Sequence, residues 1–257
     1  MQFFMNILEL YIIGGRAGYN IGVKLMTKFK SISVFFPAYN EAQTIENVTL
    51  KAREFLERIS DDYEIIIVNN SSKDKTGEIA DRLSHMYKQV RVIHNPKNNG
   101  PGEALKTGFT SAQKEFVFYT DSDGQYDINE MERFLPYADR AGAVIGYRKN
   151  RADAVLRKIT ARIYAILNRI LFGLAVKDID CSFKLVSRAV LEKIDFESRS
   201  AFINAELLLK IRKMGYPVKE IGITHYPRQY GNSRCFRFST IYSMLADMIR
   251  FKVKNEF

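Results

Sequence analysis

Between residues 31 and 148, short apolar runs alternate with segments of helical periodicity, and this alternation limits the fold more than any other feature of the chain. The apolar runs are continuous, which is typical of strands that are buried on both faces of a sheet. Strands that are each followed by a helix indicate a parallel sheet with helices on both sides. We therefore expect an α/β domain. The expected strands are residues 31–37, 63–69, 90–94, 116–120 and 143–147.

The segments between these strands have the periodicity of helices, and the pattern changes after about Arg148. Beyond that point it predicts one long helix over residues 153–174, then mixed elements, then a final helix over about 238–253. In the segment NEME we expect Asn129 to cap a helix, with Glu132 reaching back to it. The other expected helices are those over about 42–59 and 75–87 and the one that follows Gly102.

No internal repeat, low-complexity tract or linker divides the chain, and its 257 residues suffice for one α/β domain with a sizeable core. We interpret residues 31–236 as that domain. Residues 1–30 are an apolar N-terminal leader suited to an interface, and residues 237–257 are interpreted as a C-terminal amphipathic helix.

Composition excludes several classes of protein. Lys and Arg number 39 against 29 Asp and Glu, and this net charge of +10 favours anionic partners such as phosphorylated substrates or acidic membranes. Net charge alone is weak evidence for nucleic-acid binding, so we expect no nucleic acid partner. The two cysteines, Cys181 and Cys235, form no CxxC pair. This excludes a disulfide scaffold and a cysteine-based zinc site, and it fits a reducing cytosol.

The sequence also lacks an apolar run long enough for a membrane span, which takes about 18 uncharged residues. The apolar N-terminus is interrupted by Asn6 and Glu9 and has neither the basic start nor the cleavage site of a signal peptide. The apolar stretch over residues 163–176 carries Asn168 and Arg169. We therefore expect a soluble or peripheral protein.

Three polar clusters follow strands of the expected sheet, at the points where those strands end. They are PAYNE at 37–41, NNSSKD at 69–74 and DSDGQ at 121–125. Because ligands bind at the carboxyl ends of parallel strands, we expect the three clusters to meet in one crevice. Each cluster alone has the composition of an ordinary turn. Two carboxylates directly after a buried strand, Asp121 and Asp123, are nevertheless costly unless a positive charge compensates them.

A hard divalent cation would supply that positive charge. Mg²⁺ and Mn²⁺ take oxygen ligands, often one or two carboxylates together with substrate phosphates. Asp-x-Asp alone is a weak motif, but Asp121, Asp123 and Gln125 place three oxygen-bearing side chains at alternating positions. The sequence therefore predicts an Mg²⁺ or Mn²⁺ site with Asp123 and Gln125 as ligands and Asp121 on its donor side. A cation there would neutralise a diphosphate leaving group.

The chain resembles family 2 glycosyltransferases in an ordered set of segments: PAYNE, IIIVNNSSKDKTGEIA, NNGPGEALKTGF, FYTDSDGQYD, DIDCSFKLVSRAVL and GYPVKEIGITHYPRQYGNS. Within that family it is most similar to the branch of dolichyl-phosphate-mannose and polyprenyl-phosphate sugar synthases. The match covers roughly residues 31–235. The resemblance implies a GT-A fold, which is a Rossmann-like three-layer α/β/α sandwich with a mostly parallel central sheet. It also implies a metal-dependent, inverting hexosyltransferase.

The resemblance implies roles for individual residues as well. The residues expected to bind a UDP- or GDP-sugar donor are Pro37, Ala38, Tyr39, Glu41, Asn70, Asp121 and Arg148. The expected catalytic group is Asp121, Asp123, Arg228 and Glu206. The residues expected to bind the acceptor or its phosphate are Arg228, Ser233 and Arg234, the last standing where the family usually has lysine.

Two departures from the family pattern fall in the donor half. The family usually has two aspartates where this chain has Asn69 and Asn70, and an amide adds a hydrogen-bond donor while it removes a charge. We expect a changed base or donor preference, or a weakened activity, from this exchange. Pro101 also removes one backbone donor from the start of a helix that is expected to face phosphate.

The acidity of the acceptor decides whether the site needs a base. A hydroxyl acceptor needs one, and Glu206 is the candidate, although we favour a role for it in the wall of the site. His225 is more often structural in such a strand, and His85 and His94 carry no motif. A phosphate monoester, with a second pKa near ~6, is already ionised and needs positive charge instead. Such charge recurs at helical spacing, at Arg151, Lys158, Arg162 and Arg169.

The function expected from these observations is transfer of a sugar from a nucleotide sugar to a polyprenyl phosphate acceptor, dolichyl or undecaprenyl phosphate. Two alternatives remain open: a family 2 transferase that acts on a sugar hydroxyl in surface polysaccharide or glycolipid assembly, and a catalytically weak nucleotide-sugar-binding module. The joint presence of Asp121, Asp123, Gln125 and Arg228 favours an enzyme. A Rossmann oxidoreductase is disfavoured because no GxGxxG follows the first strand.

Two amphipathic segments indicate a membrane surface. The basic stripe on the helix over 153–174 accompanies an apolar face of Leu156, Ile159, Ile163, Ile166 and Ile170. The terminal helix carries an apolar stripe of Phe238, Ile241, Tyr242, Leu245, Met248 and Ile249, flanked by basic residues. For the helix over 153–174 the alternative is an ordinary amphipathic helix whose basic face is solvated, and for the terminal helix it is packing on the domain. We expect both helices to dock the protein on anionic lipid of the cytoplasmic membrane face. An integral membrane protein is a further candidate partner there.

Overall fold

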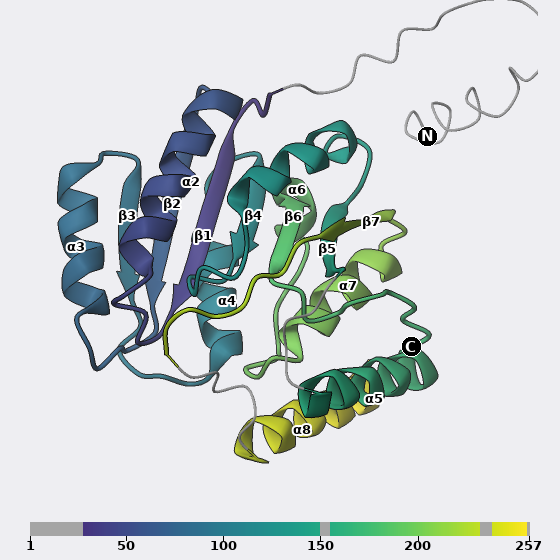
Figure 1. The fold of residues 1–257 in the computed structure, drawn as a ribbon. Coiled ribbons are helices and arrows are strands. Elements are labelled where there is room, and N and C mark those ends of the chain that lie inside the picture. The colour runs from purple at the N-terminus through teal and green to yellow at the C-terminus, as the bar shows by residue number, and fades with distance from the viewer. Residues whose placement is uncertain (1–27, 150–154, 232–237, 256–257) are drawn as a thin grey trace, which may run out of the picture.

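The computed structural model describes residues 28–149, 155–231 and 238–255, and in these residues seven strands form one sheet (Figure 1). The strand order is β3-β2-β1-β4-β6-β5-β7. All neighbouring strands are parallel except β6, which runs antiparallel to both β4 and β5. The strands are β1 (Ile32–Ala38), β2 (Tyr63–Asn69), β3 (Val90–His94), β4 (Phe116–Thr120), β5 (Ala143–Arg148), β6 (Phe183–Ser187) and β7 (Val218–Ile223).

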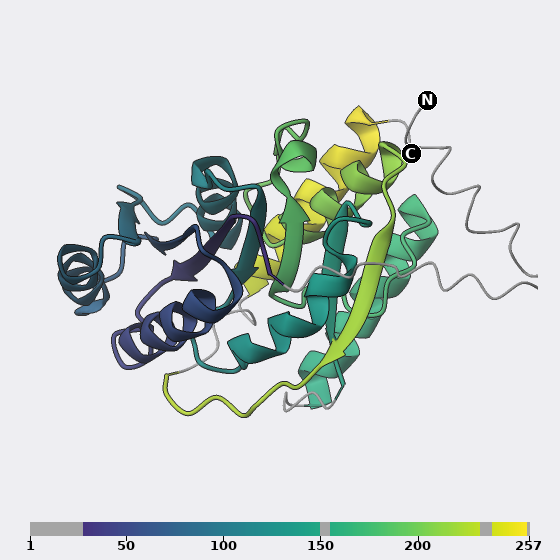
Figure 2. The same cartoon turned by 90° about the horizontal axis from the view of Figure 1, so that it is seen from above.

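Helices cover both faces of this sheet. Figure 2 shows α2 and η1 on one side and α4 and α8 on the other, which makes the three layers that the sequence predicts. The helices are α2 (Ile45–Ile59), α3 (Thr76–Met86), α4 (Pro101–Ser111), η1 (Ile128–Tyr137), α5 (Val155–Phe172), α6 (Arg188–Leu191), α7 (Ile203–Lys213) and α8 (Phe238–Lys254).

The five strands expected from the sequence are confirmed, and the second, third and fourth have the expected bounds. One local prediction is wrong. The helix near Asn129 is a 3-10 helix whose cap is Asp127, which accepts a hydrogen bond from the Asn129 backbone N–H at 3.0 Å. Asp127 precedes the element by one residue and therefore reaches its first orphan donors, whereas Asn129 already lies inside it.

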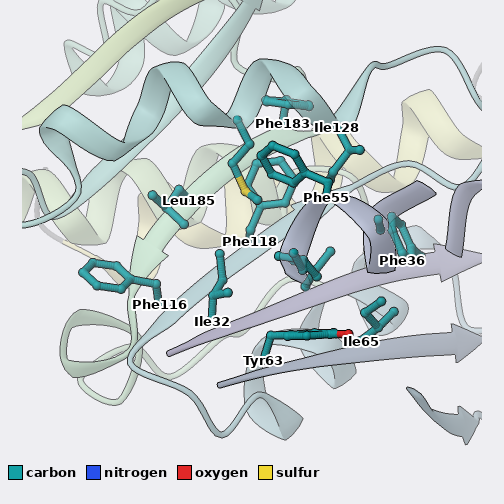
Figure 3. Close-up of a cluster of buried hydrophobic side chains, with 14 of the residues drawn as sticks. Ile32, Phe36, Phe55, Tyr63, Ile65, Phe116, Phe118, Ile128, Phe183 and Leu185 are labelled. Carbon is teal, nitrogen blue, oxygen red and sulfur yellow. The ribbon is translucent and has the colours of Figure 1, made fainter. Parts of the chain in front are cut away.

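Aromatic side chains fill the core on both faces of the sheet. On the α2 side, Phe118 of β4 packs edge-on against Phe183 of β6 with ring centroids 4.7 Å apart (Figure 3). On the α4 side, Phe35 of β1 stacks with Tyr119 of β4 at 5.4 Å. Gly108 of α4 faces the Phe35 ring, and a Cβ at that position would overlap it. The absence of a side chain at Gly108 therefore lets α4 lie close to β1.

The two long helices α5 and α8 run beside each other along one end of the domain (Figures 1 and 2). Phe251 of α8 packs against Phe172 of α5 and Phe202, with ring centroids 6.0 and 5.5 Å apart, and Met248 is buried beside them. The terminal helix is therefore attached to the domain by one apolar face. Among the described residues, no helix combines the length and the apolar character that crossing a membrane requires.

Candidate active site

The turns that follow β1 and β2 are held against each other by hydrogen bonds. The backbone N–H of Asn40 donates to the Ser72 hydroxyl at 3.0 Å, and the Asn40 side-chain oxygen accepts from the Lys73 N–H at 2.7 Å. The Glu41 N–H donates to the Thr76 hydroxyl at 2.8 Å. Asn40 has φ of 57°, in the left-handed region that non-glycine residues rarely adopt. A backbone held in such a conformation by its surroundings is typical of a functional site.

The turn after β4 meets the same place. Ser122 donates from its hydroxyl to the Pro37 carbonyl at 2.8 Å, which ties this turn to the end of β1. Asp123 accepts a hydrogen bond from the Gln125 N–H at 3.0 Å. The Gln125 side-chain amide donates to the Tyr226 carbonyl at 2.9 Å, and the Tyr226 N–H returns a bond to the Gln125 carbonyl. The first and third polar clusters of the sequence therefore lie together, as expected.

Arg228 joins these clusters to the segment after β7. Its guanidinium lies 2.5 Å from a carboxylate oxygen of Glu41 and 3.2 Å from one of Asp123. Figure 1 shows this segment, residues 224–231, running back from β7 toward the end of β1 and the start of α2. Burial raises the pKa of the Glu41 carboxyl above its ordinary value, although Arg228 offsets part of that rise. A positive side chain thus faces the carboxylates of two separate motifs.

The side chains of Asp121, Asp123 and Gln125, here called the Asp123 cluster, have the chemistry of a hard-cation site that a bound substrate would complete. Asp121 and Asp123 offer carboxylate oxygens, and the Gln125 amide donates through its nitrogen, so its oxygen is the atom suited to a cation. Among the described residues, no three His, Cys, Asp or Glu side chains converge to hold a metal by themselves. Mg²⁺ is often held by one or two carboxylates plus phosphate oxygens, and the residues present fit that arrangement.

A cavity of about 410 Å³ opens beside this cluster. Its walls come from the turn after β1, from the start of α3 and from the segment after β7. Tyr39 is half-buried and directly precedes Asn40, the first of the lining residues. Pro37 and Ala38 are the last two residues of β1. The residues that line the cavity are Asn40, Glu41, Ala42, Gln43, Asp74, Lys75, Ile79, Tyr230 and Gly231.

A second pocket, of about 390 Å³, is lined mainly by charged side chains of α5 and of the segments that follow β5 and precede β6. Its five cations outnumber its two carboxylates, so the pocket is positive. Its charged residues are Arg148, Lys149, Lys158, Arg162, Lys177, Asp178 and Asp180. This basic pocket has the charge expected of a site for an anion.

Arg148 is fixed inside the basic pocket by Asp178. Its Nε and Nη2 each donate to one carboxylate oxygen of Asp178 at 2.7 Å, and its side chain is 3% exposed. Burial alone would lower the pKa of the Arg148 guanidinium, but the hydrogen bonds to Asp178 raise it overall. The sequence predicts a donor-binding role for Arg148. The structure places it in the wall of the basic pocket, and its role toward the donor stays a prediction.

The sheet brings the basic pocket close to the Asp123 cluster. Thr120, the last residue of β4, pairs with Phe183, the first residue of β6. Asp121, which follows β4, and Asp180, which precedes β6, therefore lie at the same edge of the sheet. Burial is the largest cause of the raised pKa of the Tyr119 hydroxyl, and the negative charges of Asp121 and Asp180 raise it further. The Asp123 cluster and the basic pocket are thus neighbours.

A buried lysine, Lys184, lies near the charged groups of the basic pocket, and sequence reasoning missed it. The Lys184 ammonium donates to the Tyr119 hydroxyl and to the Asn204 side-chain oxygen, both at 3.1 Å, and to the Cys181 carbonyl at 2.5 Å. Burial lowers the pKa of Lys184. The signal was a charged residue, Lys184, at the second position of the short strand sequence FKLVS, which argues for a fully partnered buried group.

Glu206 lies away from solvent, with its side chain 0% exposed. One oxygen accepts from the Glu197 N–H at 2.8 Å and the other from the Ser198 N–H at 2.9 Å. Lys210 lies 2.8 Å from the first oxygen. This carboxylate therefore holds a loop and is poorly placed to take a proton from an acceptor. Its predicted role in the wall of the site stays a prediction.

Of the remaining predicted residues, some are described by the structure and some are not. His225 is buried, and its ring packs against that of Tyr126 with the ring centroids 5.2 Å apart. Ser233 and Arg234, predicted to bind phosphate, lie outside the described residues, as do Arg151 and most of the predicted leader.

Comparison with known proteins identifies the family. A model of the family described as glycosyl transferase family 2 matches residues 33–195. The glycosyltransferase AglD of Haloferax volcanii is 30% identical over 230 residues, which are 85% of this chain and 36% of that protein. The undecaprenyl-phosphate 4-deoxy-4-formamido-L-arabinose transferase of Salmonella choleraesuis is 25% identical over 224 residues, which are 86% of this chain and 67% of that protein. The chain thus spans only part of the length of these relatives.

Solved structures support the same conclusion about the fold. Glucosyl-3-phosphoglycerate synthase of Mycobacterium tuberculosis, solved with Mn²⁺, uridine diphosphate and phosphoglyceric acid, superimposes with a TM-score of 0.66 at 20% identity over 94% of this chain and 84% of that one. The mannosyltransferase PcManGT of Pyrobaculum calidifontis, solved with GDP-mannose and Mn²⁺, gives a TM-score of 0.62 at 18% identity over 97% and 71%. The expected GT-A fold is confirmed. From the family model and these relatives, the chain belongs to glycosyl transferase family 2.

Proposed function

We propose that this glycosyltransferase moves a sugar from a nucleotide-sugar donor to the phosphate of a polyprenyl phosphate, with inversion at the anomeric carbon. The observation that carries the proposal is the basic pocket, because it places an excess of positive charge beside the Asp123 cluster. The name of the Salmonella relative, a transferase to undecaprenyl phosphate, supports the same class of acceptor.

In this proposal the donor lies at the ends of β1, β2 and β4. Tyr39 and Glu41 line the nucleotide side, and Arg228 meets the diphosphate, since it already faces the two carboxylates that border that place. A divalent cation held by Asp123 and Gln125 would neutralise charge on the leaving nucleoside diphosphate. Release of that anion needs compensating charge, and Arg228 supplies part of it.

The acceptor phosphate lies in the basic pocket. A phosphate monoester is mostly ionised at neutral pH, because its second pKa is about 6, so one of its oxygens attacks the anomeric carbon without a base. The bond from that oxygen to the sugar forms as the bond to the nucleoside diphosphate breaks. Lys158 and Arg162 of α5 hold the phosphate by charge, and a single displacement inverts the configuration.

The absence of a suitable base at Glu206 supports this acceptor over a sugar hydroxyl. A hydroxyl must lose its proton during attack and needs a carboxylate or imidazole within hydrogen-bond reach. Glu206 accepts hydrogen bonds from two backbone N–H groups and is closed to solvent. Glu206, the base that the sequence suggested for a hydroxyl acceptor, is therefore unsuited to that role.

A polyprenyl acceptor resides in a bilayer, and we propose that α5 and α8 bring the site to the cytoplasmic membrane face. The isoleucines of α5 are 50–74% exposed, whereas an ordinary amphipathic helix packs its apolar stripe against the core of the domain. Tyr242 and Val253 of α8 are 76% and 83% exposed. Basic residues flank both stripes, and apolar burial together with attraction to anionic lipid gives peripheral binding. The exposed isoleucines are Ile159, Ile163, Ile166 and Ile170.

The experiment that tests the function combines the protein with UDP- and GDP-sugars, Mn²⁺ or Mg²⁺, and undecaprenyl or dolichyl phosphate. Mass spectrometry of the lipid fraction is expected to show one polyprenyl-phosphate sugar. Transfer to a saccharide hydroxyl, with no lipid-linked product from any donor, would replace the proposal with the hydroxyl-acceptor alternative.

A further inference from the structure

Two asparagines, Asn69 and Asn70, end β2 and begin the turn beside β1. The Asn70 N–H donates to the Ala38 carbonyl at 2.9 Å, so this position touches the strand that carries the donor motif. The Asn70 side chain is nevertheless 4% exposed and points to the loop between β3 and α4, residues 95–100. Direct contact between that side chain and a bound nucleoside would need the loop to move.

Every polar atom of the Asn70 side chain is used by this loop. Its amide nitrogen donates to the Asn98 side-chain oxygen at 3.2 Å and to the Gly100 carbonyl at 3.1 Å. Its oxygen accepts from the Asn95 side chain at 3.0 Å. The orientation of the Asn98 side-chain amide is fixed, because its oxygen also accepts a hydrogen bond from the Gly100 N–H at 3.1 Å. Both partners of the Asn70 nitrogen are therefore acceptors, and a carboxylate in its place would face two oxygens without a proton.

We infer that Asn70 is a positioning residue, which holds the loop over 95–100 against the end of β2, and that this loop borders the nucleoside side of the donor site. The loop leaves β3 at the edge of the sheet where the parallel strands β1 and β2 also end. The inference rests on the proposed function. It explains why an amide stands at this position: the contacts need two donors, and an aspartate has none. The loop leads into α4 through Gly100, whose φ of 105° favours glycine and whose Cβ would meet the Arg199 carbonyl at 3.0 Å.

Asn69 makes a different set of contacts and provides a matched comparison. Its oxygen accepts from the Ser72 N–H at 3.1 Å, so its nitrogen faces His94 Nδ1, at 2.9 Å. His94 Nε2 lies 2.9 Å from Asp81. If Asn69 is exchanged for aspartate, the tautomer of His94 that carries its proton on Nδ1 can donate to the new carboxylate, and the exposed Asp81 side chain can turn to solvent. Asn70 has no such neighbour, so the same isosteric exchange at adjacent positions has different consequences.

The test compares Asn70→Asp with Asn69→Asp in two measurements at pH 6.5. Hydrogen exchange of the amides of residues 95–100, without nucleotide, reports the loop directly. Calorimetric binding of UDP and GDP with MnCl₂ reports the donor site. We expect Asn70→Asp to speed loop exchange and to weaken binding about tenfold, a loss of about 1.4 kcal/mol, while Asn69→Asp stays within about threefold of the wild type. The double variant Asn70→Asp/Asn98→Lys, which supplies a donor to the new carboxylate, is expected to recover most of the loss.

Unchanged loop exchange and nucleotide binding in Asn70→Asp would overturn the inference, and so would equal losses in the two single variants. If Asn70→Asp does not fold, Asn98→Leu removes the same contact at an exposed position, and it must then show the faster exchange and the weaker binding. Failure of the wild type to bind either nucleotide would count against the proposed function, whereas the exchange data would still decide the role of Asn70.

Discussion

The guanidinium of Arg228 lies 2.5 Å from the carboxylate of Glu41, and 187 positions of sequence separate the two residues. The contact joins the segment after the last strand of the sheet to the turn after the first strand. The same guanidinium reaches Asp123 at 3.2 Å. Three motifs that are separate in the sequence therefore meet at one positive charge, and this is the place where the diphosphate of a donor is proposed to bind.

Exchange of Asp123 for alanine is expected to lower the transfer rate by about two orders of magnitude or more, since it removes a proposed cation ligand and leaves Arg228 without one of its partners. Arg228→Ala is expected to have an effect of similar size, and EDTA is expected to reduce the wild type in the same way. Initial rates with saturating donor measure this. Arg82→Ala, which removes only an exposed pair with Glu46, is the control and should keep full activity. Full activity of Asp123→Ala would refute the metal site.

Glu206→Gln is expected to destabilise the protein by about 1–3 kcal/mol while it leaves measurable turnover. The new amide nitrogen would face one of the backbone N–H groups of Glu197 and Ser198, which both donate to the carboxylate. Urea unfolding and activity per folded molecule separate the two effects. Abolished turnover in a variant of unchanged stability would instead identify Glu206 as a base and favour a hydroxyl acceptor.

Glu64 is expected to make stability depend on pH. Burial alone raises the pKa of this carboxyl, but hydrogen bonds from Arg91, Ser33 and the Gln113 N–H outweigh it and lower the pKa below the ordinary 4.5. A carboxyl with a lowered pKa in the folded state stabilises that state above the ordinary value, and the stabilisation is lost as pH falls through the folded value. Glu64→Gln should therefore cost about 1–3 kcal/mol at pH 7 and progressively less below pH 4.5. A deficit that is constant between pH 3 and 7 would contradict this.

Membrane binding is expected to depend on the exposed stripe of α5. Ile163→Ser with Ile170→Ser removes apolar surface that lies outside the core, so binding to anionic vesicles should fall about tenfold or more while the melting temperature changes little. Flotation with phosphatidylglycerol vesicles at low salt measures the binding. Truncation of α8 is a poorer test because Met248 and Phe251 belong to the core. If the wild type does not float with anionic vesicles, peripheral binding through these helices is wrong.

The sequence predicts the strands β1, β2 and β4 well for a physical reason. They are almost wholly buried, and each contains a run of at least three consecutive apolar residues, such as Ile65–Val68 in YEIIIVN, that is bounded by turn residues. Strand β6 escaped prediction because it has only five residues, and Lys184 leaves just Leu185 and Val186 as a continuous apolar run. The partners that offset the cost of burying Lys184, Tyr119 and Asn204, come from other elements. Local pattern does not report such distant compensation.

The same distinction applies to the site. Motif residues at strand ends, such as Glu41 and Asp123, could be placed together because parallel strands end at one edge. The partners of Asn70 and Glu206 could not, since both side chains bind loops whose path depends on tertiary packing. Asp178, which fixes Arg148, was missed as well. No spacing rule links the two residues, which are 30 positions apart on different segments.

The most direct measurement of the central claim compares two acceptors that differ only in the phosphate. The protein receives a radiolabelled nucleotide sugar with Mn²⁺ and either polyprenyl phosphate or the corresponding free polyprenol, and the label in the lipid phase is counted. The account predicts transfer to the phosphate alone, with a loss of about tenfold or more when Lys158 and Arg162 of the basic pocket are both exchanged for glutamate. Transfer to the free alcohol at a comparable rate, or undiminished transfer to the phosphate by the charge-reversed variant, would contradict it.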